Sequence, residues 1–281
     1  MNYINCKKAL TPELLEETVK FWSQNSYQHI GVILNSYTNS DAILSYTFQN
    51  ELVRLKNTFT DVYNKSNNIK NNKELSLISA AFLFENQNFI KLLERLKFEG
   101  FNGYPILSQN IFHYIYEQRY INAILSKTIP KSNILITVNF KPFKDTTLSC
   151  IYNHMYFWSI IGAMHPAILM GISPAGDVLP TALQKKLTNI KNKFNAIDFM
   201  LTSLKKPVSS KELFDIFINF ETVNDEFLHL LTDMINGKEK ILPDIFSSVL
   251  PQSFYGALSH MIAEHTYVKK LNKHFRLFFK R

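Results

Sequence analysis

Two patterns occur twice in this chain, in the same order, and they constrain its fold more than any other feature. The pattern FW-x6-H lies at 21–29 and again at 157–165, and these pairs hold the chain's two tryptophans. The pattern HxxxExxY lies at 113–120 and again at 260–267. Rare residues that recur in order indicate an internal duplication. We therefore expect the second half to repeat the fold of the first.

The apolar residues between these patterns keep the same register in both halves. At a constant offset of 138, Glu74, Leu75, Phe82, Phe89, Leu92 and Leu93 correspond to Glu212, Leu213, Phe220, Phe227, Leu230 and Leu231. Offsets elsewhere range from 135 to 147, as expected when loops change length between rigid elements. The sequence predicts two domains, 1–135 and 136–281.

Each half reads as four helices by the spacing of its apolar residues. The predicted helices span about 12–37, 41–65, 73–97 and 107–127, then 148–172, 177–205, 209–236 and 248–279. Thr11, Asp41, Asp177 and Ser209 are the expected N-caps of four of them. The stretch from Thr128 to Leu148 is expected to join the halves in an extended form. The predicted fold is all-α, with two tandem four-helix bundles.

The composition excludes a wholly disordered or fibrous chain. Apolar residues make up 46% of the chain and the formal net charge is +8, which fits a globular protein and does not by itself indicate a nucleic-acid binder. The basic segment 269–281 is interpreted as a solvated helix end. Two cysteines, Cys6 and Cys150, are too few for a disulfide framework, so a reducing cytoplasm is the expected location.

Neither a membrane span nor a nucleotide-binding or hydrolase motif is expected. The N-terminus lacks the apolar core of a signal peptide. The longest apolar stretch, 158–172, is interrupted by Ser159, Gly162, His165 and Pro166. The sequence contains no Walker-type loop, GxGxxG, GxSxG or HExxH.

Helix geometry predicts that the repeated polar residues converge. His29 lies seven residues after Trp22, and His113 lies four before Glu117, so each group shares one helix face. The first and fourth helices of an up-down bundle are antiparallel neighbours, and these residues lie at the same height. Tyr120 continues the face of His113. The same reasoning applies to the second half.

Two imidazoles and one carboxylate at one level suit a divalent metal such as Fe(II), Zn(II) or Mn(II), because buried groups of this kind persist only when paired or metal-bound. The predicted metal ligands are His29, His113, Glu117, His165, His260 and Glu264. A second interpretation needs no metal. The same His, Glu and Tyr residues could form hydrogen bonds that only fix the register of the helices, in a structural or interaction protein.

Two copies of FW-x6-H followed by HxxxExxY, in tandem four-helix units, resemble the two-repeat ferritin-like family of unknown function from bacilli and clostridia. The resemblance spans nearly the whole chain. It implies a pair of ferritin-like bundles and a site for iron or another metal, with no established reaction. The matching positions are the six residues named above.

The sequence departs from that family in two respects. An acidic residue often precedes the family's first-helix histidine, whereas Gln28 and Met164 stand here. A ferritin-type di-iron site also needs Glu-x-x-His on two helices. The spacing occurs once, at Glu226 and His229, on a polar stripe expected to be solvated. Oxygen-activating di-iron chemistry is therefore not expected. His154, His265 and His274 have no corresponding histidine in the first half, and they are expected at the surface or at its boundary.

Overall fold

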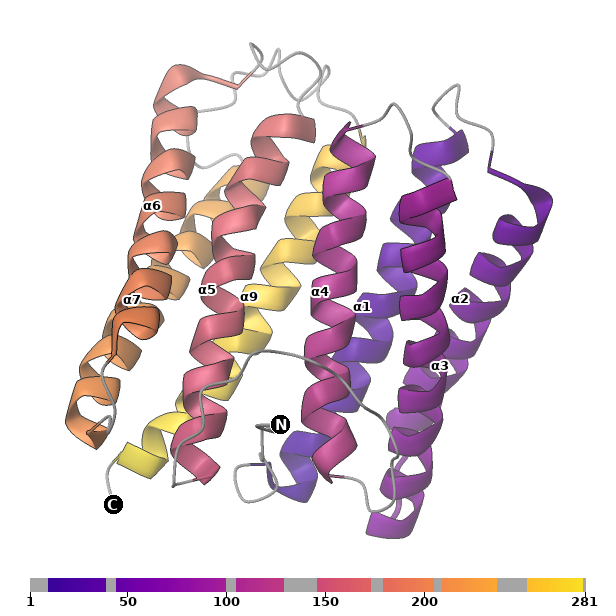
Figure 1. The fold of residues 1–281 in the computed structure, drawn as a ribbon, viewed down its shortest axis with the longest axis horizontal. Coiled ribbons are helices and arrows are strands. Elements are labelled where there is room, and N and C mark those ends of the chain that lie inside the picture. The colour runs from indigo at the N-terminus through magenta and orange to yellow at the C-terminus, as the bar shows by residue number, and fades with distance from the viewer. Residues whose placement is uncertain are drawn as a thin grey trace. The chain divides into compact units, whose positions relative to one another are not determined.

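The computed structural model describes residues 10–38, 44–99, 105–128, 146–172, 179–204, 209–236 and 252–279. Within these ranges the chain forms eight α-helices and no strand, which confirms the all-α prediction (Figure 1). The helices are α1 (Pro12–Thr38), α2 (Tyr46–Ser66), α3 (Asn72–Glu99), α4 (Pro105–Thr128), α5 (Thr146–Ile172), α6 (Thr181–Ser203), α7 (Ser210–Ile235) and α9 (Gln252–Phe279).

Two predicted caps are confirmed and two helix starts are corrected. The Thr11 hydroxyl accepts from the backbone N–H of Leu14 at 3.3 Å, and Ser209 forms a capping box at the start of α7. However, α2 begins at Tyr46 with Ser45 as its N-cap, five residues later than predicted. Helix α6 begins at Thr181, after Pro180, which provides no side-chain cap. Asp41 and Asp177 lie outside the described residues.

In the first unit, the helices pack as in a four-helix bundle. Helix α1 contacts α2, α3 and α4, while α2 contacts α3 and α3 contacts α4. Each helix turns one apolar stripe inward, as α2 does with buried residues at three- and four-residue spacing. Trp22, Phe59, Phe82 and Phe89 are completely buried and form the centre of this core.

The second unit is built in the same way from α5, α6, α7 and α9. Helix α5 contacts the other three, α6 contacts α7, and α7 contacts α9. Its core centres on Trp158, Phe194, Phe220 and Phe227, all completely buried. Gly162 allows α5 to approach α6 closely, because a Cβ atom there would lie 2.6 Å from the Phe194 ring. Helices of both units thus place one apolar face, and the polar residues embedded in it, in the interior.

The chain divides into two compact units, Met1–Pro142 and Phe143–Arg281. The predicted domain boundary at residue 135 lies outside the described residues, as does most of the stretch predicted to be extended. Its last residues, from Thr146, are helical and begin α5.

Cys150 is buried in α5 and disulfide-bonded, which does not fit the reducing compartment that the cysteine count suggested. Cys6 lies outside the described residues. Among the described helices, none is long and apolar enough to cross a membrane.

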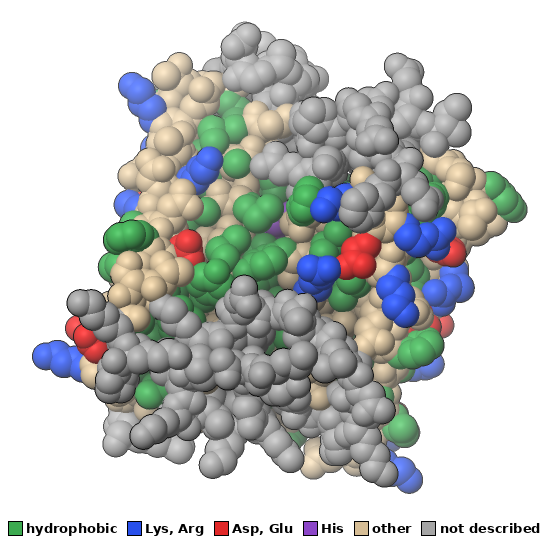
Figure 2. Space-filling view, in the orientation of Figure 1, with side chains coloured by type: hydrophobic (Ala, Val, Ile, Leu, Met, Phe, Trp, Pro, Cys, Tyr) green, Lys and Arg blue, Asp and Glu red, His purple; other side chains and the backbone are tan. Residues whose placement is uncertain are grey.

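The polar faces of the helices carry interspersed charges. Acidic side chains lie next to basic ones on the face seen in Figure 2. Exposed ion pairs join neighbouring helices, such as Arg95 with Glu51 at 3.1 Å and Lys269 with Asp225 at 3.1 Å. These pairs are typical of solvated helix faces and contribute little stability individually.

Candidate metal centre

In the first unit, a buried carboxylate lies between two imidazoles. Glu117 of α4 has no exposed surface. Its Oε2 atom lies 3.3 Å from Nε2 of His29 on α1, and its Oε1 atom lies 3.1 Å from Nε2 of His113, one turn earlier on α4. The three residues that the sequence predicted to converge in this half are therefore in contact.

The second unit repeats this arrangement. Glu264 of α9 is completely buried. Its Oε2 atom lies 3.2 Å from Nε2 of His165 on α5, and its Oε1 atom lies 3.1 Å from Nε2 of His260 on α9. The side chain of His260 is 13% exposed, so it is the member of this group that lies nearest to solvent.

Charge in the second group is set by competition between burial and the two imidazoles. Burial alone raises the pKa of Glu264, because a carboxylate loses its hydration in the interior. The charges of His260 and His165, and their hydrogen bonds, outweigh that effect and hold the pKa of Glu264 well below its ordinary value. The carboxylate is thus ionised and depends on positive charge beside it.

Behind His29, the first unit places an amide and an aromatic ring. Gln118 Nε2 lies 3.4 Å from His29 Nδ1, and the Ser26 hydroxyl lies 3.0 Å from Gln118 Oε1. The Tyr114 ring stacks on His29 with centroids 3.9 Å apart. Asn86 of α3 donates to the backbone carbonyl of Gln118 at 2.9 Å, which holds this part of α4 against α3.

Behind His165, the second unit places another histidine. His265 Nε2 lies 2.9 Å from His165 Nδ1, and His265 Nδ1 lies 2.7 Å from Asn224 Oδ1. Asn224 of α7 also donates to the backbone carbonyl of His265 at 3.2 Å. Burial lowers the pKa of His265 well below its ordinary value, and the nearby His165 lowers it further, against the opposing effect of Glu264.

The repeated tyrosines pack against the repeated tryptophans. The rings of Trp22 and Tyr120 have centroids 6.3 Å apart, and those of Trp158 and Tyr267 are 6.4 Å apart. Both tyrosines are buried. The FW and HxxxExxY patterns therefore meet across the helix pair that carries the His and Glu residues, and the aromatic contact fixes the register of that pair.

The arrangement fits a divalent metal. Two ligand atoms that each lie about 2.1 Å from an ion are roughly 3.0 Å apart in octahedral and 3.4 Å apart in tetrahedral coordination. The nitrogen–oxygen distances of 3.1 to 3.3 Å fall within that interval. Because each carboxylate oxygen has its own imidazole, the carboxylate can bind one ion with both oxygens or present one oxygen to each of two ions. Buried His and Glu residues of this chain can thus hold a divalent metal.

The predicted positions of His154 and His265 at the surface or its boundary are wrong. Both side chains are buried, whereas His274 is partly exposed. His154 Nε2 contacts Asn272 Oδ1 at 3.0 Å. His265 directly follows Glu264 in the sequence, where the first half has Gln118, and this difference is the available signal that a third imidazole adjoins the group.

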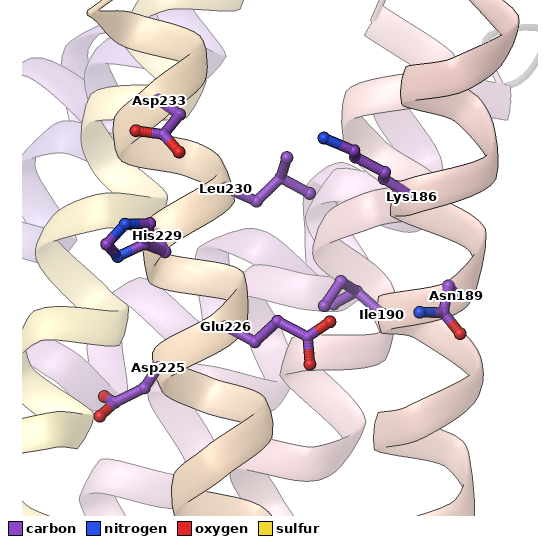
Figure 3. A pocket seen from close by; sticks show the side chains of 8 residues that line it. All are labelled: Lys186, Asn189, Ile190, Asp225, Glu226, His229, Leu230 and Asp233. Atoms are coloured by element: carbon purple, nitrogen blue, oxygen red, sulfur yellow. The ribbon is translucent and has the colours of Figure 1, made fainter. Parts of the chain in front are cut away.

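The surface pair Glu226 and His229 is solvated, as predicted. Both side chains are exposed, at a groove of about 510 Å³ between α6 and α7. Figure 3 shows that Glu226 points toward α6, while His229 points away from it. Glu226 accepts from Lys193 Nζ at 2.6 Å. The two side chains do not converge on a common point.

The sequence of this chain matches no known family model. It also matches none of the curated proteins with which it was compared. The geometry of the two His and Glu groups therefore carries the functional argument.

Proposed function

We propose that this chain is a ferritin-like metal-binding protein made of two duplicated four-helix bundles, each of which binds an iron-type divalent ion. The observation that carries the proposal is the completely buried glutamate that lies between two imidazole Nε2 atoms in each unit. The proposed ligands are His29, His113 and Glu117 in the first unit and His165, His260 and Glu264 in the second. No reaction is assigned.

The energetic argument starts from the cost of burying charge. A carboxylate in an apolar interior is strongly destabilising unless cations or hydrogen-bond donors compensate it. Here Glu117 and Glu264 are completely buried, and imidazole nitrogens lie 3.1 to 3.3 Å from their oxygens. A divalent ion between imidazole nitrogens and a carboxylate supplies that compensation directly.

The donor set indicates which ions fit. Imidazole nitrogen with carboxylate oxygen suits Fe(II), Zn(II) and Mn(II), whereas Ca(II) and Mg(II) prefer oxygen alone. Three protein residues leave coordination positions for water or another small ligand. The resemblance to a ferritin-like family favours iron among these ions, and direct metal analysis decides between them.

The alternative is a structural network without metal. Nitrogen–oxygen distances of 3.1 to 3.3 Å also suit hydrogen bonds from neutral imidazoles to the carboxylate. In that case the His and Glu residues only fix the register of helix pairs, and the chain is a structural or interaction protein. The contacts repeat in both units under either hypothesis.

Metal analysis of the protein purified without a histidine tag separates the two hypotheses. We expect bound metal in wild-type protein after exposure to Fe(II), and about half as much in either Glu117→Gln or Glu264→Gln. His113→Ala and His260→Ala should each lose metal from one unit. The control is His229→Ala, which removes an exposed histidine of α7 outside both groups. Metal content that stays below one ion per chain and is unchanged in all four variants would reject the proposal.

A further inference from the structure

The second unit contains a chain of contacts that ends at its carboxylate. Asn224 contacts His265, His265 contacts His165, and His165 contacts Glu264. The orientation of the Asn224 amide is fixed, because its Nδ2 atom donates to the His265 carbonyl at 3.2 Å. Its Oδ1 atom must therefore accept a hydrogen bond from the N–H at His265 Nδ1.

Counting the N–H groups along this series of side-chain contacts shows that the series needs one extra positive charge. Asn224 Oδ1 takes an N–H from His265, and one N–H must lie between the two imidazoles. Two neutral imidazoles carry only these two N–H groups. In the third contact, His165 Nε2 then has no proton. Its lone pair faces Glu264 Oε2, and the two atoms lie 3.2 Å apart. Either a third proton or a metal ion must lie there.

The first unit has no such requirement. Gln118 stands where the second unit has His265, and an amide can turn either its NH₂ or its carbonyl oxygen toward His29 Nδ1. With the NH₂ group facing the ring, as in the structure, a neutral His29 has its proton on Nε2, where it satisfies Glu117. Both tautomers of His29 are compatible with this surrounding, and one of them satisfies the carboxylate without a metal.

We infer that His265 makes the second unit the tighter metal site, because it keeps the Nδ1 atom of His165 protonated and turns the Nε2 lone pair toward Glu264. This inference rests on the proposed function. His265 acts as a positioning residue: it contacts a ligand and fixes the tautomer in which that ligand binds metal. In the first unit, an ion has to displace the Nε2 proton of His29 and reorient Gln118.

Two single-site proteins allow the units to be compared, with Zn(II) as the probe. Glu117→Gln leaves the second site and Glu264→Gln leaves the first. Competition against a chromophoric chelator gives the zinc dissociation constant of each. We expect the second site to bind at least tenfold more tightly, since loss of a partner behind a metal ligand weakens binding by about 10- to 100-fold.

Exchanging the two residues tests the role of His265 directly. In the Glu117→Gln protein, His265→Gln should weaken zinc binding by about 10- to 100-fold. In the Glu264→Gln protein, Gln118→His should strengthen it. The new imidazole N–H could donate to Asn86 Oδ1, which is buried and has no hydrogen-bond partner among the described residues. The matched control is His154→Gln, a buried histidine eleven residues from His165 on α5, about 16 Å along the helix axis.

Nitrogen-15 NMR of the imidazoles provides a readout that a general packing role would not change. Zinc-loaded Glu117→Gln protein should show His165 and His265 both protonated at Nδ1. Equal affinities in the two single-site proteins, or a His265→Gln variant that binds like its parent, would overturn the inference and leave metal binding intact. Absence of zinc binding in wild-type protein would instead overturn the proposed function. If His265→Gln does not fold by circular dichroism, the Gln118→His arm decides.

Discussion

The two units hold the same three residues in contact but differ in what stands behind them. Glu117 and Glu264 each lie between two imidazoles at nearly equal distances. Behind the histidine of α1 lies an amide, whereas behind the histidine of α5 lies a third imidazole. The comparison shows that two units can hold the same three inner residues in contact while the surrounding hydrogen bonds, which decide proton positions, differ.

The two units also differ at other positions of the same helices. His154 is buried in the second unit, and Thr18 occupies the corresponding position, 136 residues earlier, in the first. Gly162 likewise corresponds to Ser26. At these two positions the second unit therefore has a buried titratable group and a glycine, where the first unit has a threonine and a serine.

The largest expected effect on stability comes from Gly162, which lies against the Phe194 ring. Gly162→Ala places a Cβ atom 2.6 Å from Cζ of Phe194, a completely buried ring that cannot move aside. We expect a loss of about 3 kcal/mol in the free energy of unfolding, at the upper end for overpacked cores. Urea unfolding measures it. Ser26→Ala is the control in the first unit and should cost only about 1 kcal/mol, the contribution of one hydrogen bond. Equal losses would show that the two helix pairs are equally close.

The buried His154 gives a pH dependence that Thr18, at the corresponding position of the first unit, cannot give. Burial lowers the pKa of His154 from 6.5 to about 3, although the hydrogen bond to Asn272 opposes the shift. The unfolded chain therefore binds a proton before the folded chain as pH falls, and stability decreases between pH 6.5 and 3. Through this residue, the free energy of unfolding should fall by about 2 kcal/mol between pH 7 and pH 5.

His154→Gln tests that prediction by difference. The loss of stability from pH 7 to pH 5, measured by urea unfolding, should be about 2 kcal/mol smaller in the variant than in wild-type protein. Other buried groups titrate in both proteins and cancel in the comparison. A variant with the same pH dependence as wild type would show that His154 is protonated in the folded state.

Helix caps should contribute equally in the two units. Ser209 accepts from the N–H of Glu212 at 3.1 Å, and Asn71 accepts from that of Glu74 at 3.0 Å. Ser209→Ala and Asn71→Ala should each lower the free energy of unfolding by about 1 kcal/mol, because each leaves a helix N–H without its partner. Urea unfolding of the two variants checks this. A difference above about 1 kcal/mol would show that α3 and α7 depend differently on their first turns.

How far the sequence predicts this structure depends on how local the signal is. Apolar spacing placed all eight described helices, and the caps at Thr11 and Ser209 were correct because each acts on its own helix. The start of α2 was placed too early because a plausible cap, Asp41, precedes the residue that caps it, Ser45. A cap can be recognised from sequence, but competing caps a few residues apart cannot be ranked.

The candidate site was predictable where it followed helix periodicity. Spacing placed His113 and Glu117 on one face, and the repeat identified the corresponding pair. His265 was missed because a residue next to a core residue is normally rotated toward the surface. A helix in a bundle buries a wide arc, so a neighbouring position can also lie inside. Its partner Asn224 comes from another helix, and no local pattern reveals that contact.

The smallest expected effect concerns the surface ion pairs between the second and third helices of each unit. Lys193 contacts Glu226 at 2.6 Å, and Arg54 contacts Glu85 at 3.1 Å. The Glu226 side chain is 43% exposed and that of Glu85 is 14% exposed, so water screens the first pair more. Glu226→Gln should change the free energy of unfolding by less than about 0.5 kcal/mol, and Glu85→Gln by up to about 1 kcal/mol. Both effects should disappear in 1 M salt, where the screening length falls to about 3 Å. A larger loss for Glu226→Gln that persists in salt would mean that this surface pair is not merely solvated.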